Sequence, residues 1–544
     1  MRETLVLNQC EDHGFREALL KEPYVQYLHR RLDQLSEKVE TLTIELLETK
    51  DQLNKLKGMP SRPKLVASKL DSALPGEEGS VKKKGWSVKG KRKKKGLLKI
   101  HHTENIDYMD PLPGWRRHGY ERRIIQDIIV QGYNTEYILQ RWRCPNGEIK
   151  VAPLPDHSKG THFGPGLKSY ILHQYYECGV TQPLLLSSLH DYGVDISSGQ
   201  INSILNDGNA PFHDEKEALL SVGKELSEEL RTDDTGARHK FKNGFSTCIN
   251  SDLFTYFKTT GTKSRINFLQ ILRGNDTRYC INTATLDYLK QVGSSNMKYY
   301  ETLRQSYEDG ACIFYDESIL NVYLQNHGIK ADYVVKQIKE GMLIGTLIEQ
   351  GFNPQTIIHS DGAGQFNVFE HSLCWKHAER PLLNVKTYNK EHERLLGDKK
   401  LSYWSLYRSL CEYKKSPCPI LAQQLDQAFD TMCTPVNNYA SLNVVLQDIQ
   451  KKKSQLMLVL YRPKTSLHNN DSERDIRELA KRRKISSGTR SENGKMSRDT
   501  FLSLKKTCRK LGVSFWEYLN DRFSLNNHID QLSIIMMRQS CSSA

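Results

Sequence analysis

The sequence lacks the features that would place its 544 residues in a membrane or outside the cell. No apolar run reaches the roughly 18 residues that a membrane-spanning helix needs, and the N-terminal region carries no apolar signal-peptide stretch. The twelve cysteines include no C-x-x-C pair, which is typical of reduced thiols rather than of a disulfide framework or a zinc ribbon. We therefore expect a cytoplasmic protein without a membrane partner.

The sequence has fewer acidic than basic residues: 64 aspartates and glutamates against 78 lysines and arginines, which gives a formal net charge of +14. This excess favours a polyanionic partner, since each neutralised phosphate releases condensed counterions. On charge alone DNA, RNA and an acidic membrane surface all stay open. The composition, 38% apolar and 26% charged, is that of a globular protein, and the length allows two or three domains.

A heptad seam follows an N-terminal tail, residues 1–26. Its positions alternate in steps of four and three, with one polar member: Leu28, Leu32, Leu35, Val39, Leu42, Leu46, Thr49, Leu53 and Leu56. The pattern predicts a coiled coil over residues 27–57 and hence a homo-oligomer. A helix that folds back on its own chain is the alternative.

Residues 58–103 form a basic segment, which we expect to be a disordered linker. Between Gly79 and Ile100 it has ten lysines or arginines and no acidic residue. Such a run can be a solvated tether or can contact phosphates without sequence preference. Lys93 and Lys94 are the candidate contacts.

Two regions come next and carry different periodicities. The segments R-I-I-Q-D-I-I-V-Q and T-E-Y-I-L-Q-R-W-R have a period of two and precede a turn at Asn146-Gly147, so residues 104–160 are predicted to hold a small antiparallel β meander. Residues 161–215 are predicted to form a helix-turn-helix, with helices over Leu167–Cys178, Gln182–Tyr192 and Ser198–Leu205. Plain structural packing of these helices is the alternative.

The third of these helices is the candidate recognition helix, and Ser197 can cap it. Its base-contacting candidates are Ser198, Gln200 and Asn202, because glutamine and asparagine can pair with adenine in the major groove.

Three acidic residues lie in distinctive phrases. Asp233, in R-T-D-D-T-G, ends a short predicted strand that leads into further strands, and Asp361, in I-I-H-S-D-G-A-G-Q-F, ends another. Glu473 lies in H-N-N-D-S-E-R-D-I-R, a helical pattern rich in arginine and lysine. An RNase H-like sheet begins with three such strands and places the first beside a later one. Converging carboxylates can then hold two divalent cations for phosphoryl transfer.

These phrases, with C-W-K-H-A-E-R, R-R-K and L-K-K-T-C-R-K-L-G-V-S-F-W-E-Y-L, resemble those of bacterial insertion-sequence transposases of the IS sixty-six type. The resemblance covers about Arg231–Asp521 and implies a DDE enzyme with an RNase H-like catalytic domain. It implies that Asp233, Asp361 and Glu473 are catalytic and ligate Mg²⁺ or Mn²⁺, with Asp234 where the family usually has glutamate. Double-stranded DNA and accessory transposition proteins are the implied partners.

Two departures from the family pattern matter. The family's small zinc-binding element is reduced to Cys144 alone, and one thiolate cannot make a four-ligand site, so no structural zinc is expected. The spacing between the first two acids also predicts a helical insertion at about 265–354 in the catalytic domain, residues 216–500. A second insertion is predicted at about 390–460, and a helical segment at 501–544.

Several other polar residues have candidate roles near the site or in the fold. Arg477, Arg482 and Lys484 are available to backbone phosphates on the helix after Glu473. His377 could pair with Cys374 as metal ligands, but a position beside the site or a contact with DNA is favoured. His359 is expected in the core or near the site. Asp316, before Glu317, is expected to be solvated or to cap a helix.

The predicted fold is thus multidomain α/β, an RNase H-like catalytic domain with helical insertions, preceded by a coiled coil, a small β meander and a helix-turn-helix. The predicted function is DNA transposition by metal-dependent strand cleavage and strand transfer. Two alternatives stay open: an inactive or domesticated DNA-binding or regulatory protein, and an RNase H-like nuclease that cuts without joining.

Overall fold

The computed structural model divides the chain into two units, residues 1–105 and residues 106–544. It describes the following residues: 31, 100–106, 113, 115–116, 121–292, 297–310, 313–387 and 389–543. The predicted coiled coil, apart from Arg31, and the lysines Lys93 and Lys94 lie outside the described residues. No described helix has the length and apolar character needed to cross a membrane.

The first regular structure of the second unit is a hairpin of β1 (Arg141–Arg143) and β2 (Ile149–Val151), with Trp142 opposite Lys150. Gly147 adopts a φ of 86° in the turn, as the Asn-Gly pair predicts. Residues 121–140 form no helix or strand. The predicted meander is therefore wrong except for this hairpin, because the earlier period-two segment has no strand partner within the described chain.

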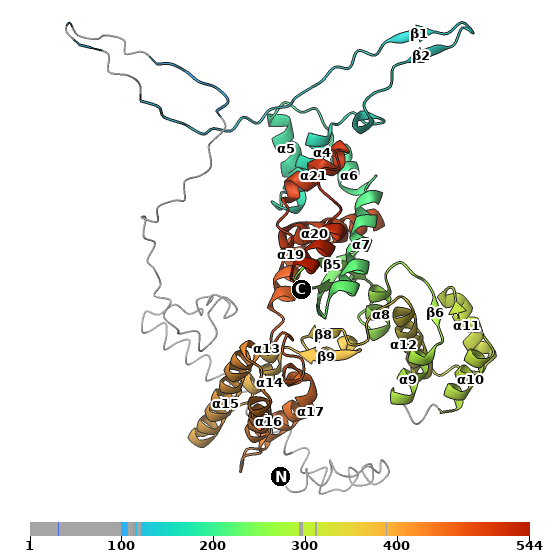
Figure 1. Ribbon diagram of the computed structural model, residues 1–544, viewed down its shortest axis with the longest axis vertical. Coiled ribbons are helices and arrows are strands. Elements are labelled where there is room, and N and C mark those ends of the chain that lie inside the picture. Colours follow the sequence, from blue (N-terminus) through green and yellow to red (C-terminus); the bar gives the residue numbers. More distant parts are fainter. Residues whose placement is uncertain are drawn as a thin grey trace. The chain divides into compact units, whose positions relative to one another are not determined.

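A group of helices follows: α4 (Pro165–Tyr176), α5 (Gln182–Asp191), α6 (Ser198–Asn206) and α7 (Ala210–Leu226). Ser197 and Gln200 form a reciprocal capping box at the start of α6, which confirms the predicted cap. Leu185 and Leu189 of α5 and Ile201 and Leu205 of α6 are buried. The three helices predicted between 161 and 215 are thus present at nearly the expected bounds (Figure 1).

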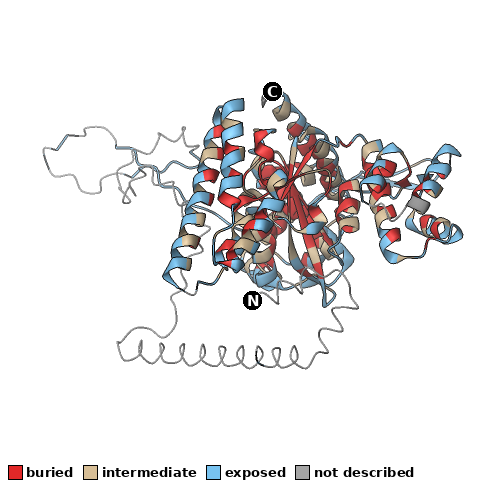
Figure 2. Ribbon diagram, turned by 90° about the horizontal axis from the view of Figure 1, so that it is seen from below, coloured by how far each residue is buried: buried red, intermediate tan, exposed pale blue. Residues whose placement is uncertain are grey.

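The central sheet has five strands in the order β5-β4-β3-β8-β9. They are β3 (Glu229–His239), β4 (Lys242–Asn250), β5 (Thr255–Thr260), β8 (Ile357–Ser360) and β9 (Glu370–Leu373). The first three are antiparallel neighbours, while β8 runs parallel to β3 and β9 parallel to β8. In Figure 2 the sheet is predominantly buried. The prediction that the strands before Asp233 and Asp361 lie side by side is confirmed.

Two C-terminal helices cover the sheet: α19 (Asn470–Ser486) packs on β3 and β4, and α20 (Glu492–Lys510) packs on β5. Polar side chains of α20, one turn apart, accept hydrogen bonds from alternate amides of β5. The pairs are Thr259 N to Asp499 at 2.6 Å, Phe257 N to Ser503 at 2.9 Å and Thr255 N to Thr507 at 3.1 Å. The helix thereby satisfies edge-strand amides that would otherwise be unpaired.

The predicted helical insertion at 265–354 is largely helical, with one small two-stranded sheet. It contains α8 (Arg265–Arg273), β6 (Tyr279–Cys280), α9 (Thr283–Val292), α10 (Met297–Glu308), β7 (Ile313–Phe314), α11 (Glu317–Asn326) and α12 (Asp332–Glu349). Asp316 caps α11 by accepting hydrogen bonds from the amides of Ser318 and Ile319, which confirms the cap weighed for it.

The second insertion is helical as predicted and packs around the buried Trp375. It contains α15 (Lys390–Lys415), α16 (Pro419–Cys433), α17 (Ala440–Lys451) and α18 (Lys453–Leu456). The chain before this insertion forms η3 (Gly364–Phe366), α13 (Trp375–Ala378) and α14 (Arg380–Leu383). The last described helices are α21 (Phe515–Ser524) and α22 (Leu532–Ser543).

Candidate active site

Asp361 directly follows β8, whereas Asp233 lies inside β3, just beyond the residues that pair with β8. The prediction that Asp233 ends its strand is therefore wrong, because β3 continues to His239 in its pairing with β4. Arg231 of β3 is opposite His359 of β8, and each chain reaches its acid two residues later. Asp361 is fixed by a turn, because its Oδ1 accepts a hydrogen bond from the Ala363 amide at 3.0 Å. Asp233 Oδ1 accepts one from the Asp234 amide at 2.8 Å. The pairing of β3 with β8 thus brings two distant segments side by side in the middle of the sheet.

Glu473 lies in the first turn of α19, and the residues before it tie that turn to the sheet. Asn469 donates from Nδ2 to the Thr232 carbonyl at 2.8 Å, next to Asp233. Arg231 donates from Nη1 to Asp471 at 2.7 Å. Both links join β3 to the start of α19, so Glu473 is held near Asp233 by buried polar contacts rather than by apolar packing alone.

The electrostatics indicate that neighbouring acids affect Asp233. The pKa of Asp233 is raised to about 7, first because the carboxyl is buried and then because three negative charges lie near it: Asp361, Asp234 and Glu473. The donated Asp234 amide opposes this rise only in part. Such perturbation by burial and like charge is typical of functional sites. The three acids predicted from separate phrases therefore share one environment.

Carboxylate oxygens are the ligands that Mg²⁺ and Mn²⁺ prefer. The neighbouring acids help to raise the pKa of Asp233, and a bound cation would offset their negative charge. The donor set therefore fits a divalent ion. Among the described residues, however, no three His, Cys, Asp or Glu side chains are already arranged to hold a metal. The site is an electrostatically coupled cluster rather than a finished coordination sphere.

His377 lies beside Glu473, as favoured from the sequence, with its Nε2 3.5 Å from Glu473 Oε1. Burial and the positive charge of Arg380 lower the pKa of His377, while the charge of Glu473 opposes this shift. Cys374 is buried, and its sulfur accepts a hydrogen bond from the Asn469 amide at 3.3 Å. The two side chains thus have separate roles, both of which help to position α19.

Asp234 points to a different set of partners from Asp233, since neighbouring strand residues face opposite sides. Lys263 pairs with its Oδ1 at 3.0 Å, and Gln365 of η3 donates to its Oδ2 at 2.6 Å. Asp234 therefore holds the loop that follows Asp361. His359 is fully buried, with Nδ1 3.2 Å from the Ser372 hydroxyl, and belongs to the core.

The predicted base-contacting residues Ser198, Gln200 and Asn202 are all exposed on α6. Gln200 uses its side-chain oxygen to accept from the Ser197 amide at 2.8 Å, and Asn202 accepts from Asn206 at 2.8 Å. Their amide nitrogens are not used in these two bonds, so each keeps donors for a partner.

The prediction that Arg482 contacts phosphates is wrong. Its side chain is buried, and its guanidinium lies over the Tyr175 ring, 3.5 Å from the centroid. The reason is helical position, because residue 482 continues the buried stripe of Asp475, Ile476 and Leu479 on α19. Lys484 is exposed and Arg477 is half-buried, so both stay accessible.

A groove of about 530 Å³ lies between α19 and α20, and sequence reasoning missed most of its residues. Its basic lining is Arg231, Arg474, Arg477, Lys481, Lys506, Arg509 and Lys510, and its acidic lining is Asp252, Asp471, Asp475 and Glu478. The one signal in the sequence was the spacing of basic residues along α19. The charges from β3 and α20 could not be assigned to this place without the fold.

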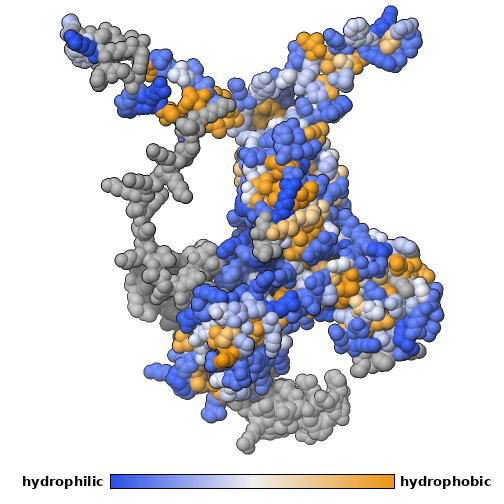
Figure 3. All heavy atoms as spheres, viewed as in Figure 1, coloured by the Kyte–Doolittle hydropathy of each residue, from blue (hydrophilic) through white to orange (hydrophobic). Residues whose placement is uncertain are grey.

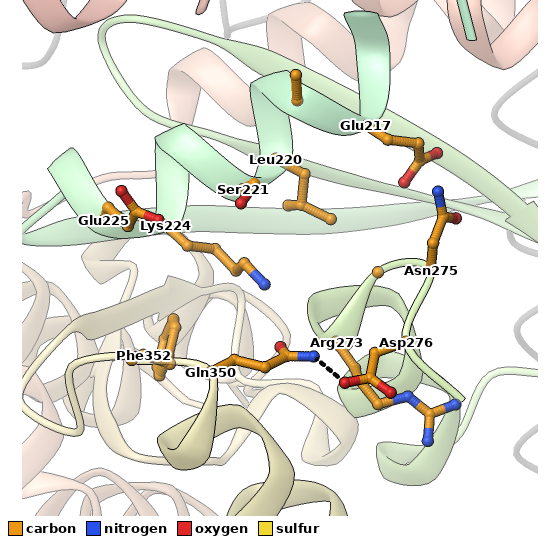
Figure 4. Close-up of a pocket in the computed structure, with 13 residues that line it drawn as sticks. Glu217, Leu220, Ser221, Lys224, Glu225, Arg273, Asn275, Asp276, Gln350 and Phe352 are labelled. Carbon is orange, nitrogen blue, oxygen red and sulfur yellow. Dashed lines mark hydrogen bonds between the residues drawn. The ribbon is translucent and has the colours of Figure 1, made fainter. Parts of the chain in front are cut away.

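A second cavity, of about 460 Å³, contains none of the three acids (Figure 4). Lys224 and Glu217 of α7 face Gln350 and Asp276 across it, and Gln350 donates to Asp276 at 2.9 Å. It lies where α7 meets the ends of α8 and α12. We therefore place the candidate active site at the acid cluster and not in this cavity.

Comparison with known proteins agrees with the motifs. Residues 322–497 match the family described as "Transposase IS66 family", a range that includes Asp361 and Glu473. The chain is also 37% identical over 315 residues to the uncharacterized protein y4jO of Sinorhizobium fredii (strain NBRC 101917 / NGR234). That alignment covers 57% of this chain and 95% of the relative. The chain belongs to the IS66 transposase family.

Proposed function

We propose that the protein is a DNA transposase, which cleaves strands at the ends of an insertion sequence and joins them to target DNA by metal-dependent phosphoryl transfer. Two observations support this proposal: the pairing of β3 with β8 brings Asp233 and Asp361 together, and the charges of Asp361 and Glu473 help to raise the pKa of Asp233. The strand order and directions of the central sheet support an RNase H-like catalytic domain. A cytoplasmic location and partners among double-stranded DNA and accessory proteins follow from the same proposal.

The three carboxylates would hold Mg²⁺ or Mn²⁺. When bound, such cations lower the pKa of an attacking water or 3′-hydroxyl and neutralise the leaving 3′-oxygen. Asp233 must give up its proton to act as a ligand. His377 lies beside Glu473 and would help to keep that helix turn in place.

The remaining residues position the substrate. Arg477 and Lys484 would contact backbone phosphates, and α6 would read element ends through Ser198, Gln200 and Asn202. Asp234, through Lys263 and Gln365, holds the loop after Asp361 in register with β3. In-line displacement needs no covalent intermediate on the enzyme.

The test compares wild-type protein with Asp361→Asn on DNA that carries the flanking element ends, with Mg²⁺ present. We expect Asp361→Asn to abolish 3′-end nicking and strand transfer while DNA binding persists, since it removes a ligand and adds no negative charge. Asp448→Asn, an exposed aspartate on α17 paired with Lys451, is the matched control and should react as wild type.

The alternatives predict different products. Nicking without joined product in the wild type would indicate a nuclease. Binding without any nicking would indicate a regulatory DNA-binding protein. An Asp361→Asn variant that nicks at the wild-type rate would refute the site assignment itself.

A further inference from the structure

The chain before and within the β1–β2 hairpin exposes an unusual number of large apolar side chains. Ile125 is 91% exposed, Tyr133 90% and Ile138 89%. Eight more are exposed between 124 and 151: Ile124, Ile128, Ile129, Val130, Tyr137, Trp142, Ile149 and Val151. Figure 3 shows hydrophobic residues on the surface of this part of the chain. Contiguous apolar surface of this kind marks an interaction site.

The segment is anchored at its centre and open on both sides. The Gly132 amide donates to the Tyr192 carbonyl at 2.6 Å, in the turn between α5 and α6. A Cβ at Gly132 would lie 3.0 Å from the Gly193 carbonyl oxygen, so glycine permits this close approach. Within the described residues, this is the backbone hydrogen bond that ties 121–139 to another element.

The hairpin is incomplete as a folding unit. Both of its strands have three residues, and every one of them is exposed. A two-stranded hairpin is marginally stable on its own, and it needs further strands or a packed face. The described chain supplies neither. In contrast, the neighbouring segment 123–131 carries five exposed β-branched residues, a type that favours strands: Ile124, Ile125, Ile128, Ile129 and Val130.

The net charge of this segment indicates which class of partner it binds. Residues 121–143 carry four arginines and three acidic residues, so their net charge is close to zero although the whole chain has +14. Nucleic acid is attracted by excess positive charge, and this segment has almost none. A partner with apolar side chains, mixed charges and open strand edges fits it best, and an identical segment has all three properties.

The area agrees with a pairing of two copies. Eleven exposed side chains at roughly 100 Å² each offer on the order of 1,000 Å² per copy. A stable interface buries about 800 Å² on each partner. The surface is therefore large enough to hold a dimer together.

We propose that residues 121–151 of two copies pair strand against strand in a shared, two-fold symmetric sheet that completes both hairpins. This interface is separate from the coiled coil predicted at 27–57. Because Gly132 binds the turn between α5 and α6, the shared sheet would also couple the two α6 helices and define their spacing.

The test uses the full chain with the photoreactive amino acid p-benzoylphenylalanine in place of Tyr133. Protein labelled with ¹⁵N is mixed with unlabelled protein, allowed to exchange, illuminated and digested for mass spectrometry. We expect mixed-isotope cross-links from position 133 to residues 121–151. The control carries the same amino acid in place of Tyr461, which follows η4 (Leu458–Leu460) and is 78% exposed. It should give no cross-links to residues 121–151.

A double variant, Ile125→Asp with Ile129→Asp, tests the apolar contact. It should lower the yield of mixed-isotope cross-links by about tenfold or more, because buried carboxylates oppose association. Thermal unfolding should not change, since both side chains are exposed in the described chain. Ile420→Asp, at an exposed position of α16, is the matched control and should leave the yield unchanged.

Other outcomes overturn the proposal. Cross-links that join only peptides of one isotope would show that the segment folds back on its own chain. Cross-links that appear only to added DNA would assign the surface to nucleic acid. Mixed-isotope cross-links that survive the double variant would place the contact elsewhere.

Discussion

Asp475 offers the sharpest test of how α19 is held on the sheet. It is buried two residues after Glu473, and it accepts hydrogen bonds from Thr255 Oγ1 at 2.7 Å and Asn250 Nδ2 at 3.0 Å. Lys506 and Lys510 of α20 lie 3.4 and 3.3 Å from its carboxylate. Asp475→Asn keeps the volume of the side chain but leaves these lysines without their main counter-charge.

The size of the effect follows from burial. Breaking a buried ion pair costs about 3–5 kcal/mol, and we take the lower end because Glu478 still lies 4.0 Å from Lys506. At about 2.1 cal/mol/K of unfolding entropy per residue, about 3 kcal/mol lowers the Tm of the unit 106–544 by roughly 3 °C. The control is Asp448→Asn, which breaks an exposed pair with Lys451 and should cost at most about 1 kcal/mol.

The assay is thermal unfolding followed by scanning calorimetry, with pH as a second variable. Burial lowers the pKa of Lys510, and Asp475 opposes that shift, so the pKa should fall further in Asp475→Asn. A lysine whose pKa is lower in the folded state than in the unfolded state reduces the free energy of unfolding when it is charged. This loss is full below the folded pKa and disappears as pH rises toward the unfolded pKa. The deficit of the variant should therefore shrink as the pH rises toward about 10.4, the ordinary pKa of lysine. An apparent Tm within about 1 °C of wild type at neutral pH would refute the reasoning.

Three further predictions concern recognition, phosphate contact and acid stability. Replacing Gln200 and Asn202 by alanine should reduce discrimination between element ends and random DNA in competition binding, by about 1–3 kcal/mol for each lost contact, and an unchanged ratio would exclude α6 as the reading helix. Arg477→Ala should weaken binding to all sequences alike and reduce the slope of log K against log salt by about 0.9, whereas a change confined to one sequence would contradict a phosphate role. Burial lowers the pKa of His371 to about 4, so the unfolded chain takes up a proton before the folded chain as pH falls below about 6.5. The wild type should therefore lose about 2 kcal/mol of unfolding free energy at about pH 5 relative to His371→Asn. Parallel pH profiles of the two proteins in thermal unfolding would contradict this prediction.

The sequence by itself determined the features that depend on local patterns. The capped helix α6, the Asn-Gly turn and the helical insertions follow from residues that are near one another in the chain, so capping, turn chemistry and periodicity could predict them. The three acids could be named because each stands in a distinctive phrase. The adjacency of β3 and β8 could be predicted because it follows from sheet topology.

Tertiary structure alone decided which charges are buried and what they meet. The helical spacing puts Arg482 on the buried stripe of α19, but its place over Tyr175 depends on how α19 docks against α4. Periodicity places Asp499 and Ser503 on one face of a helix, but their pairing with β5 amides depends on a distant strand. The raised pKa of Asp233 likewise needs the approach of acids from three segments, and such long-range charge and burial terms have no counterpart in the local sequence.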